Sequence, residues 1–142
     1  MFVIYNLFLF PIILISPLIV LIRIFLGKED QNRFKEKYGF FPKKNKPNET
    51  IWIHGASVGE ILSIIPIVRK FEEDKRIKRI LITSSTTSSS HILSKFKFKK
   101  TVHQFYPFDL NFLTKHFINH WKPKLAIFVD SEIWPNMFNN LH

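Results

Sequence analysis

The distribution of apolar and polar positions predicts one long apolar helix followed by strands and helices in alternation. Residues 1–22 include no charged side chain and almost every position is apolar, so this run is long enough to cross the hydrocarbon core of a bilayer. From residue 51 onward, short apolar runs bounded by polar or proline-containing segments are typical of buried parallel strands. The predicted strands are Ile51–His54, Arg79–Thr83, Thr101–Tyr106 and Leu125–Val129.

Segments with helical character separate these strands. Apolar residues recur at helical spacing over residues 61–71 and define a buried stripe, in which Pro66 predicts a kink. The stripe consists of Ile61, Ile64, Ile65, Val68 and Phe71. Two further helices are expected at residues 91–96 and at about residues 109–120, with Asp109 capping the second.

This order of elements predicts an α/β fold, a Rossmann-like parallel sheet with helices on both faces and ligands at the carboxyl ends of the strands. Three segments are expected: a membrane anchor helix at 1–26, a basic interfacial collar and linker at 27–50, and a Rossmann-like domain at 51–142. Within the collar, Glu29–Tyr38 is predicted to form a short surface helix that Gly39 ends.

The apolar amino-terminal run favours an uncleaved transmembrane anchor. Pro11 and Pro17 are better tolerated in a membrane helix than in a soluble one. A signal peptide is disfavoured because no basic residue precedes the run and no small-residue cleavage site follows it. A buried core helix is the alternative, but the run is apolar all round. Basic residues crowd directly after the anchor and predict a cytoplasmic location for the rest of the chain, against anionic lipid headgroups. They are Arg23, Lys28, Arg33, Lys35, Lys37, Lys43, Lys44 and Lys46.

The charge balance predicts an anionic partner. Lysine and arginine number 21 against 11 aspartates and glutamates, which gives a formal net charge of +10. Such an excess suits nucleic acid, an acidic membrane surface or a phosphorylated lipid. Nucleic acid is not expected, because the basic residues lie next to the anchor and no nucleic-acid motif is present. The absence of cysteine excludes disulfides and thiolate metal sites.

The turn after the first strand is a candidate site. Ile51–Glu60 reads as a strand, a turn of small residues and the start of a helix. Gly55 and Gly59 permit close approaches that a side chain would block. Glu60 lies in the first turn, where the helix dipole favours an ionised carboxylate. Two interpretations remain open: a base at the edge of the sheet, or a glutamate that simply stabilises the start of the helix.

A second turn is dense in hydroxyl groups. Residues 84–90 contain only serine and threonine, and they follow the second predicted strand. These hydroxyls could cap the next helix, or they could donate hydrogen bonds to sugar hydroxyls or phosphate.

Taken together, the motifs resemble the amino-terminal half of the Kdo (3-deoxy-D-manno-octulosonic acid) transferases, which are membrane-anchored glycosyltransferases of Gram-negative bacteria. The resemblance covers essentially all 142 residues and includes the anchor and the basic collar. Its motifs are His54–Glu60, Thr83–Ser89, Tyr106–Asp109 and Glu132–Asn136, in this order and spacing. Each motif is weak alone, and together they are specific.

The resemblance implies the amino-terminal domain of a GT-B glycosyltransferase, in which two Rossmann-like domains face each other across a cleft. The reaction it implies is transfer of Kdo from CMP-Kdo to the lipid A precursor (lipid IVA) in lipopolysaccharide biosynthesis, with inversion. It requires no cofactor and no metal. The enzyme would be bound to the bacterial inner membrane, with its catalytic part on the cytoplasmic face. The carboxyl-terminal domain that would hold CMP-Kdo is missing, so the 142-residue chain is expected to be a fragment and inactive alone.

The resemblance also implies roles for individual residues. Glu60 matches the family's catalytic base, which takes the proton from the attacking acceptor hydroxyl. The residues expected to bind substrate are Ser57, Gly59, Thr86, Asp130, Glu132 and Asn136. His54 could orient Glu60 or pack at the end of a strand, and packing is favoured. Trp134 could stack on a sugar or fill the core beneath the loop, and the core role is favoured. Arg33 could contact lipid phosphates or belong to a solvated charged face.

Two positions depart from the family pattern. Asp130 replaces the usual first glutamate of the Glu-x-Glu-x-Trp-Pro-Asn motif, which keeps the charge and shortens its reach. Ser89 stands where glycine is usual, which puts close backbone approach of a ligand there in doubt. The alternative function is a non-catalytic membrane-tethered module that binds acidic lipid.

Overall fold

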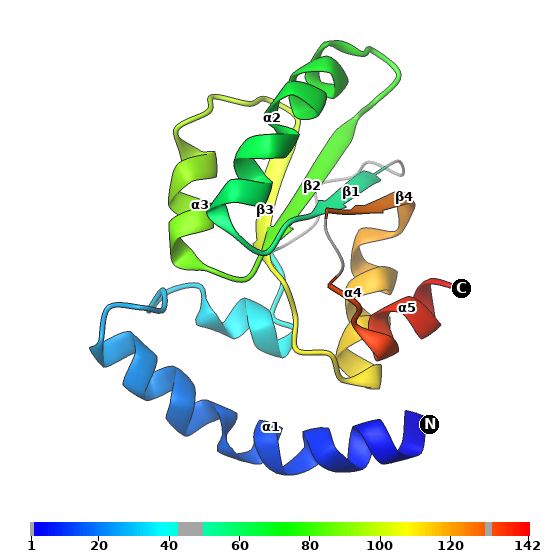
Figure 1. Ribbon diagram of the computed structural model, residues 1–142. Coiled ribbons are helices and arrows are strands. Elements are labelled where there is room, and N and C mark those ends of the chain that lie inside the picture. The colour runs from blue at the N-terminus through cyan, green and yellow to red at the C-terminus, as the bar shows by residue number, and fades with distance from the viewer. Residues whose placement is uncertain (1, 43–49, 130–131) are drawn as a thin grey trace.

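The chain folds around a sheet of four parallel strands, as a computed structural model shows for residues 2–42, 50–129 and 132–142 (Figure 1). The strands are β1 (Thr50–His54), β2 (Arg79–Ser84), β3 (Thr101–Phe105) and β4 (Pro123–Phe128), in the order β3-β2-β1-β4. In register, Trp52 of β1 pairs with Leu81 of β2 and with Ala126 of β4. Because the strands are parallel, the turns that follow them meet at one edge of the sheet.

Helices cover both faces of this sheet, which confirms the predicted fold class. They are α2 (Val58–Glu73), α3 (Thr87–Ser94), α4 (Asn111–Trp121) and α5 (Pro135–Leu141), with α1 (Phe2–Phe25) and the 3-10 helix η1 (Phe34–Tyr38) before the sheet. Figure 1 shows α2 and α3 on one side of the strands and α4 and α5 on the other. The buried apolar residues of α2 include Ile61, Ile64, Ile65 and Val68, and those of α4 include Leu113, Phe117 and Trp121.

The two faces of β1 and β2 build two separate cores because successive side chains of a strand point to opposite sides. Ile53 packs with α2 and α3, whereas its neighbour Trp52 packs with α4 and α5. The predicted stripe of α2 lies in the first core: four of its members are buried and Phe71 is partly buried. Burying each such large side chain contributes about 1.5–3 kcal/mol.

Two predicted helix starts are wrong. The helix after β2 starts at Thr87 and not at residue 91, because the Thr86 hydroxyl accepts a hydrogen bond from the Ser89 amide and caps it. Asp109 does not cap α4, whose N-cap is Leu110 without a side-chain bond. Its carboxylate instead caps α5, as described below. α2 is one continuous α-helix that includes Pro66.

The segment before the sheet packs against the sheet. The predicted surface helix is shorter than expected and is the 3-10 helix η1, and Gly39 ends it with φ +90°, as predicted. The backbone carbonyl of Lys37 accepts a hydrogen bond from the Phe108 amide at 3.0 Å. Figure 1 shows α1 running along the edge from which the turns after the strands project. Ile4–Phe25 of α1 is long and apolar enough to cross a membrane.

Candidate functional site

The β1–α2 turn holds the Glu60 carboxylate by two hydrogen bonds. The Ala56 amide donates to Glu60 Oε2 at 2.9 Å, and the Ser57 hydroxyl donates to Oε1 at 2.6 Å. Ser57 is also the N-cap of α2, since its hydroxyl accepts from the Glu60 amide at 3.3 Å. The spacing of three residues makes this reciprocal arrangement a form of capping box. Glu60 is half-buried, and each carboxylate oxygen keeps a further lone pair for a ligand.

The two glycines of this turn meet different surroundings. A β-carbon at Gly55 would lie 3.2 Å from Glu60 Cβ and 3.4 Å from Ile61 Cδ1, so Gly55 allows Glu60 to pack against β1. A β-carbon at Gly59 would meet only the Ser57 hydroxyl, at 4.0 Å. No contact within the described chain therefore requires a glycine at position 59, which is exposed beside the carboxylate.

The hydroxyl-rich turn after β2 joins the turn after β1. Ser89 is fully buried, and its hydroxyl donates to the carbonyl of Ala56 at 3.3 Å. The hydroxyls of Thr86 and Ser89 lie 2.7 Å apart. The capping interpretation of this turn is thus confirmed. The Ser89 side chain is therefore directed into the protein and not into the space outside the turn.

A hydrogen-bonded chain crosses the sheet edge to Glu132. Trp52 Nε1 donates to Thr83 Oγ1 at 2.8 Å, and Thr83 Oγ1 lies 2.8 Å from His54 Nδ1. His54 Nε2 lies 3.3 Å from Glu132 Oε2, which also accepts from Trp134 Nε1 at 3.2 Å. Two N–H groups from different elements thus hold a partly exposed carboxylate beside the end of β1.

The protonation of His54 follows from its surroundings. Burial lowers the pKa of His54 below its ordinary value, although the Glu132 and Glu60 carboxylates oppose this shift. The ring is therefore neutral near pH 7, with its proton on Nε2, because the carboxylate it faces can only accept. The Thr83 hydroxyl then donates to Nδ1. His54 packs, as favoured from the sequence, and it orients Glu132.

Two aromatic rings enclose this group. The Tyr106 ring lies 4.2 Å from the His54 ring and 5.6 Å from the Trp134 ring, measured between centroids. Trp134 packs on the second core, the role favoured for it from the sequence. The Tyr106 hydroxyl is buried without a hydrogen-bond partner among the described residues. No role for Tyr106 was predicted from the sequence. The feature that could have indicated one is its position directly after β3 and before Pro107.

Asn136, which was expected to bind substrate, is buried in a different part of the edge. Its backbone amide donates to Asp109 Oδ2 at 3.0 Å, and its side-chain amide donates to the Asp109 carbonyl. The same side chain exchanges hydrogen bonds with Asn6 of α1, at 2.8 and 3.3 Å. These contacts bind α5 to the β3–α4 turn and to α1. Its role toward a substrate stays a prediction.

Arg33 belongs neither to a solvated face nor to a free lipid-binding patch. Its guanidinium donates to the Glu36 carboxylate at 2.6 and 3.0 Å and to the His103 carbonyl at 3.0 Å. Glu36 in turn accepts from the Phe105 amide at 2.8 Å. The arginine and glutamate of the collar therefore fasten η1 to β3. The signal in the sequence was their spacing of three residues, which suits an ion pair on one face of a helix.

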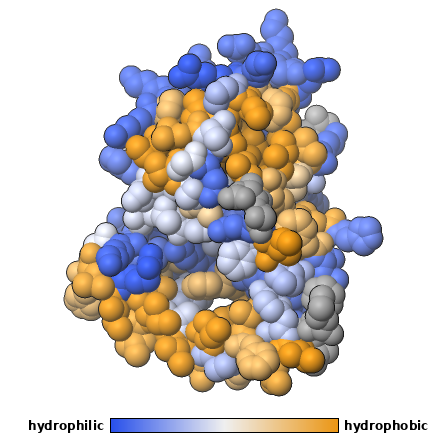
Figure 2. All heavy atoms as spheres, viewed as in Figure 1, coloured by the Kyte–Doolittle hydropathy of each residue, from blue (hydrophilic) through white to orange (hydrophobic). Residues whose placement is uncertain are grey.

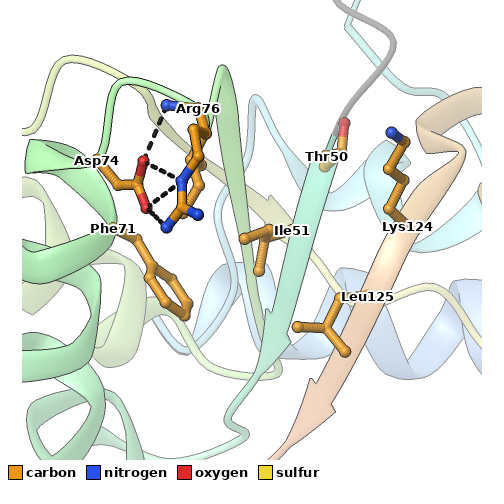
Figure 3. A pocket seen from close by; sticks show the side chains of 8 residues that line it. Thr50, Ile51, Phe71, Asp74, Arg76, Lys124 and Leu125 are labelled. Atoms are coloured by element: carbon orange, nitrogen blue, oxygen red, sulfur yellow. Dashed lines mark hydrogen bonds and ion pairs between the residues drawn. The ribbon is translucent and has the colours of Figure 1, made fainter.

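One described pocket, of about 420 Å³, lies beside the turns after β1 and β2 and is lined by Val58, Thr87, Ser88, His91 and Ile92. Another lies far from them. A pocket of about 430 Å³ lies at the amino ends of β1 and β4, lined by apolar side chains such as Ile51, Phe71 and Leu125 and by the Asp74–Arg76 ion pair (Figure 3). It is at the opposite edge of the sheet from Glu60. Within the part of the chain that the structure describes, no group of three or more His, Cys, Asp or Glu side chains is placed to hold a metal ion. The expectation of a metal-independent reaction stays a prediction.

Apart from Asn136, the described site residues that were predicted form two groups at one sheet edge. The first contains Ser57, Gly59, Glu60 and Thr86, joined through Ala56 and Ser89. The second contains Glu132, joined to β1 through His54. Asp130 lies outside the described residues. The arrangement presents two carboxylates, each oriented by N–H or O–H donors, on a surface suited to accept protons or hydrogen bonds from a polyhydroxyl ligand.

Comparisons with known proteins show which sequences this chain is similar to. A family model described as 3-deoxy-D-manno-octulosonic-acid transferase (kdotransferase) matches residues 32–142. A 3-deoxy-D-manno-octulosonic acid transferase of Rickettsia bellii is 39% identical over 137 residues, which cover 94% of this chain and 33% of that protein. The Haemophilus influenzae transferase is 35% identical over 112 residues, 78% of this chain and 26% of its own length. A probable mitochondrial transferase of Arabidopsis thaliana is 34% identical over 126 residues, 87% and 28% respectively. The chain therefore spans about a third or less of these relatives.

Proposed function

Because the chain belongs to the 3-deoxy-D-manno-octulosonic acid transferase family, we propose that it is the acceptor-side domain of an enzyme that transfers Kdo from CMP-Kdo to the lipid A precursor in lipopolysaccharide biosynthesis. The relatives are named as Kdo transferases, and the match to the Rickettsia bellii protein covers 94% of this chain. The donor CMP-Kdo would be bound by a second domain, since the chain covers only about a third of a relative such as the Rickettsia bellii transferase.

The observation that carries the proposal is the orientation of the Glu60 carboxylate by the Ala56 amide and the Ser57 hydroxyl. Glu60 would act as general base. It would take the proton from an acceptor sugar hydroxyl while that oxygen attacks the anomeric carbon of Kdo. The bond from that carbon to the CMP oxygen breaks with its electron pair, and the configuration inverts. The two hydrogen bonds to Glu60 limit its rotation, which reduces the ordering required in the transition state.

The rest of the sheet edge supports acceptor binding. The exposed backbone at Gly59 leaves room for a sugar next to the base. Thr86 follows β2 and Glu132 follows β4, the strands on either side of β1. The carboxylate of Glu132 is oriented to accept hydrogen bonds from hydroxyl groups. The +10 net charge favours the phosphates of an acidic lipid and a membrane surface with anionic lipids. We place the domain on the cytoplasmic face of a bacterial inner membrane.

The test is Kdo transfer in membranes that lack their own transferase. CMP-Kdo and the lipid A precursor would be supplied to the 142-residue chain, to the longest reading frame that contains it, and to that longer protein carrying Glu60→Gln. Glutamine keeps the shape of glutamate but is not basic. We expect activity in the longer protein and a loss of at least about a hundredfold in Glu60→Gln, as for removal of a general base.

The matched control is Glu73→Gln at the far end of the same helix, where the side chain is exposed. It should transfer Kdo at the wild-type rate. Undiminished transfer by Glu60→Gln would show that another group is the base. Absence of transfer by every longer form, with retained binding of the lipid A precursor, would instead favour the alternative, a non-catalytic membrane-bound module.

A further inference from the structure

The outer side of α1 is an apolar surface that nothing in the described chain covers. Figure 2 shows apolar side chains gathered along α1 at the bottom of the molecule. Leu7, Leu14 and Leu21 are 72%, 73% and 52% exposed, and they lie one heptad apart on the same side of the helix. In water, so large an apolar surface is unfavourable by about 25 cal/mol per Å².

The inner side of α1 carries its polar groups, and these contact the domain. The Tyr5 hydroxyl donates to Asp109 Oδ2 at 2.8 Å. Asn6 and Asn136 exchange two hydrogen bonds, at 2.8 and 3.3 Å. These contacts attach the amino end of α1 to the loop before α4 and to the start of α5, which follow β3 and β4.

The middle of α1 is attached through Ser16. Ser16 is buried, and its hydroxyl donates to the Ile13 carbonyl at 2.8 Å. That carbonyl has no helical partner because Pro17 lacks an N–H. The Ser16 oxygen lies 3.0 Å from the Tyr38 hydroxyl of η1, and Tyr38 is the donor because the single Ser16 proton is already used. The Ser16 side chain thus provides the hydrogen bond that the Ile13 carbonyl lacks, and it attaches α1 to η1.

The carboxyl end of α1 is held by a buried carboxylate. Arg23 Nε donates to Glu29 Oε2 at 3.2 Å, and Lys37 Nζ of η1 donates to the same oxygen at 2.9 Å. Gly27 lies between Arg23 and Glu29 in the sequence, and its φ of +66° allows the chain to turn after the helix. α1 is therefore fixed at its start, its middle and its end.

These attachments are incompatible with a helix that spans the bilayer below the domain. From Tyr5 to Arg23 the helix rises about 27 Å, close to the roughly 30 Å thickness of the hydrocarbon core. If Arg23 stayed at the cytoplasmic surface of a spanning helix, Tyr5 would reach the far surface. Asp109 could not follow it there, because the domain around it is folded and charged.

We propose that α1 lies in the plane of an anionic membrane surface, with its outer side in the lipid and its inner side docked along the edge of the sheet that carries Glu60. The lipid supplies the apolar partner that the exposed leucines require. Lys28, exposed directly after the helix, and the +10 net charge supply the attraction to anionic headgroups. This arrangement differs from the transmembrane anchor expected from the sequence, and it does not depend on catalysis.

The chain contains no cysteine, so single nitroxide labels can be placed without removing native residues. Leu7→Cys, Leu14→Cys and Leu21→Cys would be labelled separately in the full chain, reconstituted in vesicles of phosphatidylglycerol and phosphatidylcholine. Label depth would be measured from relaxation by oxygen and by a water-soluble nickel complex. We expect all three labels in the lipid at equal depth, within about 3 Å. The control Glu73→Cys, at the far end of α2, should report water.

A spanning helix would place the Leu14 label about 10 Å deeper than the other two, from the helical rise over seven residues, and would overturn the proposal. Three labels in water would also overturn it. A second variant, Tyr5→Phe with Asn6→Ala, removes the contacts at the amino end. We expect it to make the depths at Leu7 and Leu21 unequal, whereas the exposed control Asn32→Ala should not. Equal depths in the double variant would show that these contacts do not hold the helix.

Discussion

The carboxylate of Asp109 lies on the amino end of α5, where its Oδ2 accepts a hydrogen bond from the backbone amide of Asn136 at 3.0 Å. Its Oδ1 accepts a second one from the Met137 amide at 2.8 Å. A side chain after β3 therefore caps a helix after β4, and the cap joins the two loops at the sheet edge. Tyr5 of α1 donates to the same carboxylate, so this one group also connects α1 to the domain.

Asp109→Asn should lower the free energy of unfolding by about 1–2 kcal/mol. The amide keeps one accepting oxygen but turns an NH₂ group toward the other backbone donor of α5. Urea unfolding in mild detergent, followed by tryptophan fluorescence, measures the change. Glu73→Gln serves as the neutral control. A loss below about 0.5 kcal/mol would show that the cap does not stabilise the fold.

Glu36→Gln should detach η1 from β3. The carboxylate accepts from the Arg33 guanidinium at 2.6 and 3.0 Å, from Phe105 N at 2.8 Å and from Gln104 Nε2 at 3.0 Å. Glutamine leaves one oxygen to accept and leaves Arg33 without its ion pair, so we expect a loss of about 2–3 kcal/mol. The same unfolding measurement applies, with the exposed Lys35→Gln as control. Equal stability of the two variants would contradict the assignment.

Gly55→Ala and Gly59→Ala should separate packing from ligand access. The new methyl group at residue 55 meets Glu60 Cβ at 3.2 Å, so overpacking should cost about 1–3 kcal/mol. At residue 59, in the first turn of α2, alanine should be neutral or stabilising by up to about 1 kcal/mol. In the longer protein Gly59→Ala should nevertheless reduce Kdo transfer, because its methyl group enters the space beside Glu60. Full activity of this stable variant would remove Gly59 from the acceptor site.

The histidine His103 should make the fold sensitive to acid. Burial, reinforced by the Arg33 guanidinium, lowers the pKa of His103 from 6.5 to about 3. Between these values the unfolded chain binds a proton that the folded chain excludes, so stability falls as the pH falls from 6.5 toward 3. The slope from this one group is about 1.4 kcal/mol per pH unit.

The measurement is the urea midpoint as a function of pH for the wild type and for His103→Asn. Asparagine keeps an oxygen that can accept from Arg33, as His103 Nδ1 does at 3.0 Å. The variant should lose stability less steeply below pH 6.5, although it is less stable at pH 7. The exposed His91→Asn should follow the wild-type slope. Parallel curves for all three proteins would show that another group governs acid unfolding.

Much of the fold follows from local patterns in the sequence. The alternation of the four strands with the helices between them, the two-sided coverage of the sheet and the buried stripe of α2 were predicted, whereas α5 was not. Such patterns are local because side-chain periodicity depends on neighbours a few residues away. The same holds for the turn around Glu60, where Ser57 and Glu60 cap one helix from three residues apart. Short-range geometry of this kind is determined by backbone dihedrals and not by the rest of the molecule.

Contacts between distant residues were decided only by the tertiary structure. The sequence placed Asp109 before the helix that follows it, whereas the folded chain brings Asn136 to it across 27 residues. His54 and Glu132, separated by 78 residues, could be assigned to one sheet edge but not paired. Likewise, the apolar composition of α1 indicates lipid, but its orientation depends on where Tyr5 and Ser16 find partners. A hydrogen bond requires its two atoms about 3 Å apart, and only packing of the whole chain determines which groups come that close.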